Sequence, residues 1–195
     1  MILEGIVTTT NSDGTTNIAP MGPLCQDDEL ATFELRPFCS SNTYQNIKRT
    51  GQGVLHICDD VLLFARAAVG TDLNDIELEM AQEVSVECLV ECCRRYEFVT
   101  TWTEDSGNRA SFLCKTVHAS RVQDFFGFNR ARHSVIEACI LATRVDFLPI
   151  QEIKSQFEHH AVVINKTGGE REQQAFRLLN DYLTQRAERG QEAQK

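Results

Sequence analysis

The 195-residue chain lacks any apolar run near the eighteen or so residues that a membrane span requires. We therefore expect no membrane-spanning segment. The N-terminus also lacks the basic and apolar regions of a signal peptide, because Met1 to Glu4 lead directly into strand-like sequence. These two absences predict a cytoplasmic protein.

Positive charge is scarce as well. The sequence has nineteen Lys and Arg residues and twenty-eight Asp and Glu residues, which gives a formal net charge of -9 and a pI near 5.0. Nucleic acids and anionic membranes both bind basic protein surfaces, so we expect neither of them as a partner.

Several catalytic and binding motifs are missing. The sequence has no G-x-S-x-G nucleophile elbow, no G-x-G-x-x-G loop and no Walker loop. Lys166-Thr167-Gly168-Gly169 contains Walker letters in the wrong order and follows no strand. The sequence therefore predicts no hydrolase of these classes and no nucleotide site of these kinds.

The eight cysteines form no C-x-x-C pair. Cys88, Cys92 and Cys93 lie close in sequence, but no histidine or second cysteine pair accompanies them at zinc-binding spacing. We expect no metal site and interpret the cysteines as reduced, buried small hydrophobic residues.

The patterns that are present describe strands first and helices last. Alternating or β-rich sequence predicts two hairpins and two further strands, and periodic sequence predicts two short helices among them. These elements cover residues 2–20 (hairpin), 29–35 (strand), 41–50 (helix), 53–58 (strand), 61–64 (helix) and 94–119 (hairpin). Residues 70–87 are acidic and irregular, which indicates an exposed excursion or a frayed helix.

Helical periodicity dominates the last third of the chain, over residues 130–147, 150–164 and 171–188. We predict a mainly β fold with α: an antiparallel barrel over residues 1–125, and a three-helix unit over residues 126–195 that packs on the barrel.

One stretch suits a phosphate. Arg36 ends a predicted strand, and the hydroxyls of Ser40, Ser41 and Thr43 collect where a helix begins and leaves its first N–H groups unpaired. Arginine can bind two phosphate oxygens at once. The alternative is that Ser41 or Thr43 is an ordinary N-cap, which these residue types favour.

Three other stretches leave two interpretations each. The prolines around Met21-Gly22 free neighbouring N–H groups to face a planar heterocycle, or they only turn a barrel corner. Asn129 and Arg130 begin a helix, where they either place an N-cap and a cation beside an anionic or polar ligand or only start the helix. The aromatic face of residues 96–102 is either core or a surface for stacking on a cofactor.

The chain resembles the domain-of-unknown-function 447 family, which belongs with the split-barrel, FMN-binding, flavin-reductase-like proteins. The resemblance rests on residues 2–10, 17–23, Leu35 to Phe38 with Ser41 and Thr43, 96–98 and 128–131. It implies a six-stranded split barrel that forms a homodimer with FMN at the interface.

The resemblance also implies roles for particular residues. Arg36, Ser40, Ser41 and Thr43 would hold the phosphate. The backbone from Asn17 through Ala19 to Met21 and Gly22 would hold the isoalloxazine edge, and an N–H of Met21-Gly22 would face its N1/O2 side. Asn129 and Arg130 match the family at the start of the long helix.

The implied function is FMN binding, in a flavin-dependent oxidoreductase of unknown substrate. Genes of the family are often found beside genes of tetrahydromethanopterin-linked one-carbon metabolism, which is an association and not a mechanism. Two alternatives remain: a flavin carrier or sensor without turnover, and a protein that binds another phosphorylated heterocycle such as a deazaflavin.

Overall fold

A computed structural model describes residues 1–26 and 29–192, and its chain falls into two compact units. The first unit comprises Met1–Cys58 and Asp75–Phe125. The second comprises Asp59–Asn74 and the chain from Phe126 onward. The chain therefore passes between the units three times, and each unit is described separately below.

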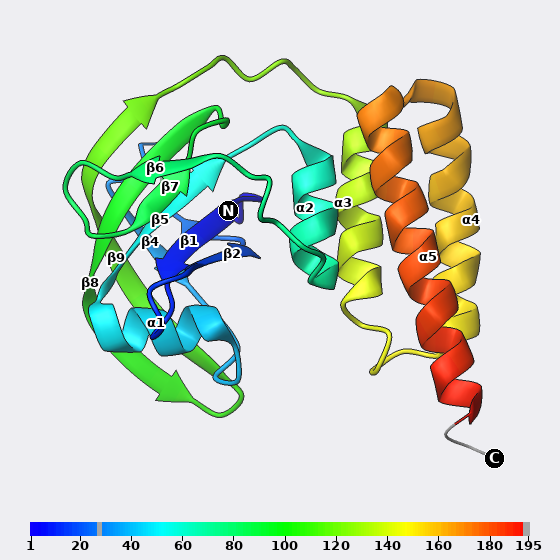
Figure 1. Cartoon of the computed structure of the whole chain (residues 1–195), viewed down its shortest axis with the longest axis horizontal. Coiled ribbons are helices and arrows are strands. Elements are labelled where there is room, and N and C mark those ends of the chain that lie inside the picture. The colour runs from blue at the N-terminus through cyan, green and yellow to red at the C-terminus, as the bar shows by residue number, and fades with distance from the viewer. Residues whose placement is uncertain (27–28, 193–195) are drawn as a thin grey trace. The chain divides into compact units, whose positions relative to one another are not determined.

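The first unit is built on a seven-stranded antiparallel sheet, in the order β2-β1-β5-β8-β9-β4-β3 (Figure 1). Its strands are β1 (Ile6–Thr10), β2 (Thr16–Pro20), β3 (Leu24–Cys25), β4 (Thr32–Leu35), β5 (Gln52–Ile57), β8 (Arg94–Ser106) and β9 (Arg109–Arg121). Both predicted hairpins are confirmed, as β1 with β2 and β8 with β9. The strand predicted over residues 29–35 begins only at Thr32, because Leu30 has a positive φ of 54° that interrupts extended backbone.

The segment before β1 closes this sheet into a barrel. Ile2 forms a bridge with Leu24, and the Cys25 amide donates to the Met1 carbonyl over 2.8 Å. Residues 1–3 thus pair with β3 and then continue into β1 at the other side of the sheet. The barrel predicted from the sequence is confirmed, with seven strands instead of the six that the resemblance implied, because the two-residue β3 also pairs with β4.

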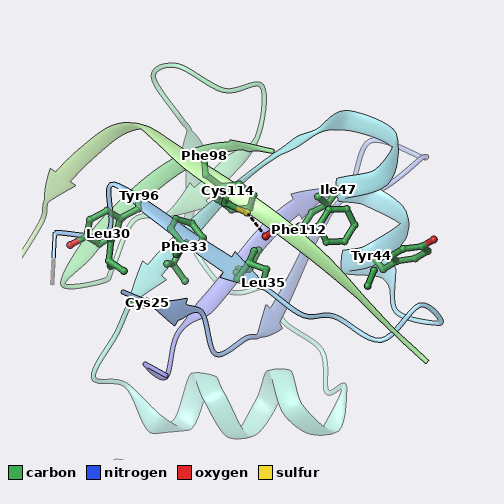
Figure 2. Close-up of a cluster of buried hydrophobic side chains, with 13 residues drawn as sticks. Cys25, Leu30, Phe33, Leu35, Tyr44, Ile47, Tyr96, Phe98, Phe112 and Cys114 are labelled. Atoms are coloured by element: carbon green, nitrogen blue, oxygen red, sulfur yellow. Dashed lines mark hydrogen bonds between the residues drawn. The ribbon is translucent and has the colours of Figure 1, made fainter. Parts of the chain in front are cut away.

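The barrel interior is filled by apolar side chains (Figure 2). Phe33 and Phe98 meet edge to face, with ring centroids 5.4 Å apart. Cys25 and Cys114 lie in the same cluster as free thiols. Packing of this kind, rather than polar contacts, stabilises the interior, and it confirms that these two cysteines act as small hydrophobic residues.

The predicted aromatic face of β8 is only partly correct. Tyr96 and Phe98 are buried in the barrel, but Trp102 is 51% exposed. The register with β9 shifts between Thr100 and Trp102, and this bulge turns the indole away from the interior.

The segment predicted as an exposed excursion or a frayed helix, residues 70–87, is not helical, and it is irregular and largely exposed up to Glu83 except for a short strand. Residues 78–93 nevertheless form a cover on the outer side of the barrel. β6 (Leu78–Met80) pairs with β7 (Glu87–Leu89), and Val84 and Val86 are buried against Val54 of β5. The sequence interpretation missed this cover because the acidic residues on both sides of Val84 and Val86 hid these two buried apolar positions.

Two buried polar side chains fasten this cover. The Glu97 carboxylate accepts the amides of Gln82, Glu83 and Val84 at 2.9, 2.6 and 3.2 Å. His56 lies with Nδ1 3.1 Å from the Ile6 carbonyl oxygen, and its Nε2 accepts the Leu89 amide over 3.1 Å. Because Nε2 accepts, the proton lies on Nδ1 and the ring is neutral. Burial lowers the pKa of His56 to about 3.

The second unit is helical. It contains α2 (Val61–Val69), α3 (Arg130–Ala142), α4 (Ile150–Thr167) and α5 (Glu170–Glu192). The three predicted C-terminal helices are confirmed, with Phe176, Leu179 and Leu183 of α5 buried. The first of them ends at Ala142, earlier than predicted, in turns that precede Pro149. α2, whose N-cap is Asp60, belongs to this unit although it lies within residues 1–125.

Candidate functional site

The N-terminus of α1 (Asn42–Thr50) lies directly after the hydroxyl-rich turn. Ser41 is the N-cap: its Oγ accepts the Tyr44 amide over 3.2 Å and donates to the Phe38 carbonyl over 2.7 Å. Gly51 ends the helix in the left-handed conformation, with φ 69°. The cap interpretation of Ser41 is therefore confirmed, and its hydroxyl proton is used inside the protein.

Other donors at this helix end remain open. The amides of Asn42 and Thr43 have no hydrogen-bond partner within residues 1–26 and 29–192, and the exposed Ser40 hydroxyl has none there either. The first turn carries no acidic side chain. Since a helix N-terminus has partial positive charge, these groups together suit an anion.

A polar network joins this helix end to the first hairpin. Asn17 Nδ2 of β2 donates to Thr43 Oγ1 over 3.1 Å and to Thr9 Oγ1 over 3.2 Å. Asn46 Nδ2 donates to the same Thr9 oxygen over 3.0 Å. Thr43 is only 2% exposed. The two stretches singled out in the sequence, residues 17–22 and 36–43, therefore meet at Asn17 and Thr43.

The backbone of β2 presents donors selectively. The Met21 amide donates to the Gly5 carbonyl over 2.9 Å, so it is used within the barrel. Because bonds alternate along an antiparallel pair, the amides of Asn17 and Ala19 also point toward β1. The Ile18 amide faces the open edge, since β2 ends the sheet. Of the pair Met21-Gly22, this leaves Gly22 as the free donor within the described chain.

Gly22 lies where the segment before β1 passes close to the chain after β2. A Cβ there would lie 2.8 Å from Ile2 Cγ2 and 3.2 Å from the Leu3 carbonyl oxygen. A side chain would push away the segment that pairs with β3.

Two arginines flank the turn. Arg36 is exposed and makes two bonds to Glu34, at 2.8 Å from Nε and 2.9 Å from Nη2. This pairing, together with Ser111, lowers the pKa of Glu34. Arg109 donates from Nη1 to the Arg36 carbonyl over 2.7 Å, and its Cζ lies 3.8 Å from the centroid of the Phe38 ring.

Sequence reasoning missed Arg109, Thr9 and Asn46. The tip of the β8–β9 hairpin brings Arg109 to the turn, because the Cys39 amide donates to the Asn108 carbonyl over 3.0 Å. No local pattern encodes such a contact between residues far apart in sequence. Thr9 and Asn46 carried no distinguishing signal, because other polar residues surround them in the sequence.

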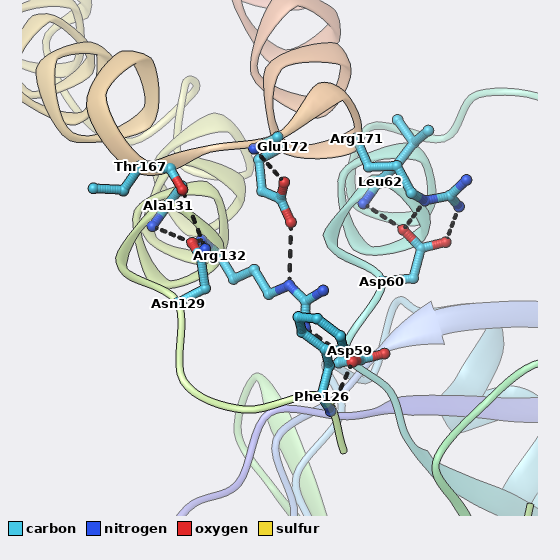
Figure 3. Close-up of polar contacts among 11 residues, drawn as sticks. Asp59, Asp60, Leu62, Phe126, Asn129, Ala131, Arg132, Thr167, Arg171 and Glu172 are labelled. Carbon is cyan, nitrogen blue, oxygen red and sulfur yellow. Dashed lines mark hydrogen bonds and ion pairs between the residues drawn. The ribbon is translucent and has the colours of Figure 1, made fainter. Parts of the chain in front are cut away.

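Asn129 and Arg130 lie in the second unit. Asn129 caps α3: its Oδ1 accepts the amides of Ala131 and Arg132 at 2.8 and 3.2 Å, and its Nδ2 donates to the Thr167 carbonyl over 3.1 Å (Figure 3). Arg130 is exposed. The Asn129 side chain is thus engaged at both ends by its own unit.

Within residues 1–26 and 29–192, no helix combines the length and apolar character needed to cross a membrane. No group of three His, Cys, Asp or Glu side chains in the same residues is arranged to hold a metal ion.

Two family models match the chain. Residues 3–123 match the model described as Protein of unknown function (DUF447) N-terminal domain, and residues 129–181 match the model described as Protein of unknown function (DUF447). The chain belongs to the DUF447 family. The predicted resemblance is therefore confirmed.

Solved structures show the same fold. An FMN-bound DUF447 protein from Methanosarcina mazei has 21% sequence identity and a TM-score of 0.80, over 93% of this chain and 94% of that chain. 2-Nitrobenzoate 2-nitroreductase from Pseudomonas fluorescens has 19% identity and a TM-score of 0.53, over 60% and 64%. An FMN-binding protein from Thermus thermophilus, with bound 1-cyclohex-2-enone, has 12% identity and a TM-score of 0.51, over 62% and 70%. The DUF447 chain thus has a flavin-reductase-like split barrel with C-terminal helices.

Proposed function

We propose that this DUF447 protein binds FMN, with the phosphate at the N-terminus of α1 and the isoalloxazine edge along β2. The observation that carries the proposal is the hydrogen bond between Asn17 and Thr43, which joins the two stretches at one place. The FMN named for the proteins from Methanosarcina mazei and Thermus thermophilus supports the choice of ligand.

The chain's own groups fit the two ends of such a ligand. The open amides of Asn42 and Thr43, with the Ser40 hydroxyl, offer donors to a phosphate. The outward amides of Ile18 and Gly22 offer donors to the carbonyl and imide edge of a heterocycle. Asn17 holds Thr43 in place between these two sets of donors.

We further propose that the protein is a flavin-dependent oxidoreductase. Bound flavin supplies the hydride and electron chemistry, and the protein supplies position and electrostatics. An N–H near the pyrimidine side of the ring favours the reduced, anionic form, and Gly22 is the candidate donor. Oxidation of NADH or NADPH by the FMN-loaded protein supports an enzyme, whereas stable flavin without turnover indicates a carrier or sensor.

A homodimer with FMN at the interface is the proposed assembly. Exposed apolar side chains on the outer side of the barrel support it, among them the cross-strand neighbours Trp102 and Leu113. Light scattering of the eluted protein distinguishes dimer from monomer. A cytoplasmic location is proposed as well, and the eight free thiols are consistent with it.

The test of the FMN proposal uses the double variant Ser40→Ala with Thr43→Val. It removes the open Ser40 hydroxyl and the Thr43 hydroxyl that accepts the bond from Asn17, and it retains the volume of the buried threonine. Hydrogen bonds to a charged phosphate contribute about 1.5–3 kcal/mol each, so we expect FMN affinity to fall at least about tenfold. Ser12→Ala, at an exposed serine of the β1–β2 turn, is the matched control. Full retention of FMN by the folded double variant contradicts the phosphate assignment.

A further inference from the structure

Arg36 is poorly available to a ligand. Its guanidinium already binds both carboxylate oxygens of Glu34, through Nε at 2.8 Å and Nη2 at 2.9 Å. Glu34 is held in turn by the Ser111 hydroxyl. A phosphate that recruited Arg36 would have to break a two-bond ion pair and leave a half-buried carboxylate without its partner.

Arg109 is held in a different way. One nitrogen, Nη1, donates to the Arg36 carbonyl over 2.7 Å, and the guanidinium carbon lies 3.8 Å from the centre of the Phe38 ring. Both contacts fix the position of the cation without neutralising it. Within residues 1–26 and 29–192, Arg109 has no carboxylate partner, and its Nε and Nη2 make no hydrogen bond.

The position of Arg109 is tied to the phosphate turn by backbone bonds. Arg109 and Phe38 form an antiparallel bridge, and the amides on either side follow it: Cys39 donates to Asn108 over 3.0 Å, and Ala110 donates to Pro37 over 3.1 Å. The Phe38 carbonyl also accepts the Ser41 amide over 2.9 Å. The residue that carries the cation thus also closes the turn that precedes α1.

The charge of a phosphate makes a cation necessary here. A phosphate monoester carries about -1.5 to -2 charges at pH 7, and the chain has a formal net charge of -9. Amide donors and a helix N-terminus offset only part of that charge. A guanidinium with two open nitrogens matches the paired oxygens of a phosphate.

We propose that Arg109, held on the ring of Phe38, is the cation that recognises the phosphate of the bound flavin nucleotide, and that Arg36 is a structural partner of Glu34. This inference rests on the proposed FMN site and makes Arg109 the residue that discriminates a phosphorylated flavin from an unphosphorylated one. Any heterocycle with the same phosphate, a deazaflavin included, would meet the same group.

The experiment measures the affinities of FMN and of riboflavin for the full chain, by quenching of flavin fluorescence. We expect Arg109→Gln to lower FMN affinity about 10- to 100-fold, the effect of one or two charge-assisted bonds, and to leave riboflavin affinity unchanged. Arg36→Gln separates the two arginines, because it retains the preference for FMN under this proposal. Arg121→Gln, an exposed arginine at the other end of β9, is the matched control.

The outcomes are distinct. If Arg109→Gln keeps the full preference for FMN, or if Arg36→Gln loses it instead, the assignment of Arg109 is overturned. If the wild-type chain binds neither flavin, the proposed function itself fails. Should Arg109→Gln not fold, as judged by circular dichroism, Arg109→Lys replaces it: a several-fold loss of FMN affinity alone supports the assignment, and unchanged affinity overturns it. Inorganic phosphate is then added as a competitor. If the site recognises the whole nucleotide, free phosphate displaces FMN only weakly. If the site binds any phosphate equally, free phosphate displaces FMN readily.

Discussion

The two helix N-termini at α1 and α3 look alike in sequence and differ in the structure. Each begins with a polar N-cap, Ser41 or Asn129, and each has arginine nearby. At α1 the next two amides and the Ser40 hydroxyl are open within the described chain. At α3 the cap binds two amides and a carbonyl.

The arginines follow the same division. Arg132 at α3 is neutralised twice, by Asp59 at 2.9 Å and by Glu172 at 3.1 Å, and it also lies over the Phe126 ring (Figure 3). Arg109 near α1 is held by a carbonyl and an aromatic ring only. The α3 end is therefore saturated by its own unit, whereas the α1 end has open amides and a cation without a carboxylate partner within the described chain, as the proposed FMN site requires.

Substitution of Arg132 gives the largest expected effect. Arg132→Met leaves the part-buried carboxylates of Asp59 and Glu172 without their shared partner, at an expected cost of about 2–4 kcal/mol in the free energy of unfolding. FMN affinity of the folded variant should not change. Urea unfolding and flavin titration measure the two quantities. Arg130→Met, at an exposed neighbour, is the control and should change stability by less than about 0.5 kcal/mol.

Low pH should weaken a second buried polar contact, the one between His56 and the cover of the barrel. His56 is neutral and fully buried, and its pKa is lowered from 6.5 in the unfolded chain to about 3. The unfolded state therefore binds the proton more tightly. The stability that depends on the neutral ring is complete above pH 6.5 and is lost as the pH falls toward 3, by about 1.4 kcal/mol per pH unit.

Urea unfolding between pH 7 and pH 4.5 measures this loss. His56→Gln removes the titrating group, so its stability, although lower at pH 7, should depend less steeply on pH. The Asn17–Thr43–Thr9–Asn46 network contains no titratable side chain, so acid should not act on it directly. Equal slopes for wild type and His56→Gln would contradict the role given to His56.

Substitution of the α3 cap has a smaller effect. Asn129→Ala removes a cap and the bond to the Thr167 carbonyl, and it should cost about 1–2 kcal/mol in the free energy of unfolding. Thermal unfolding measures it. If the variant instead lost FMN at unchanged stability, Asn129 would belong to the ligand site and the contrast between the two helix ends would be wrong.

Much of the fold was readable from local patterns, and particular residues show where that ended. Alternation predicted both hairpins, and Ser41 marked the start of a helix because a cap depends on neighbours in sequence. Trp102 was assigned to the wrong face, since a bulge depends on the partner strand. Val84 and Val86 were missed because their burial depends on Val54 and Glu97, which lie in other strands.

The candidate site shows the same limit: local patterns were readable from the sequence, and contacts between distant residues were not. The sequence indicated both of its stretches, and the bond between Asn17 and Thr43 brings them together. It did not indicate Arg109. The position of this residue depends on a hairpin tip that contacts the turn at Arg36, 73 residues earlier in the sequence. Contacts of that range cannot be derived from periodicity or capping.

The most direct test of the central claim is a crystal structure of the protein loaded with FMN. We expect a phosphate oxygen within about 3 Å of the amides of Asn42 or Thr43, with the flavin ring extending along β2. A phosphate bound elsewhere, or an α1 N-terminus that stays empty while FMN occupies another part of the protein, would contradict it.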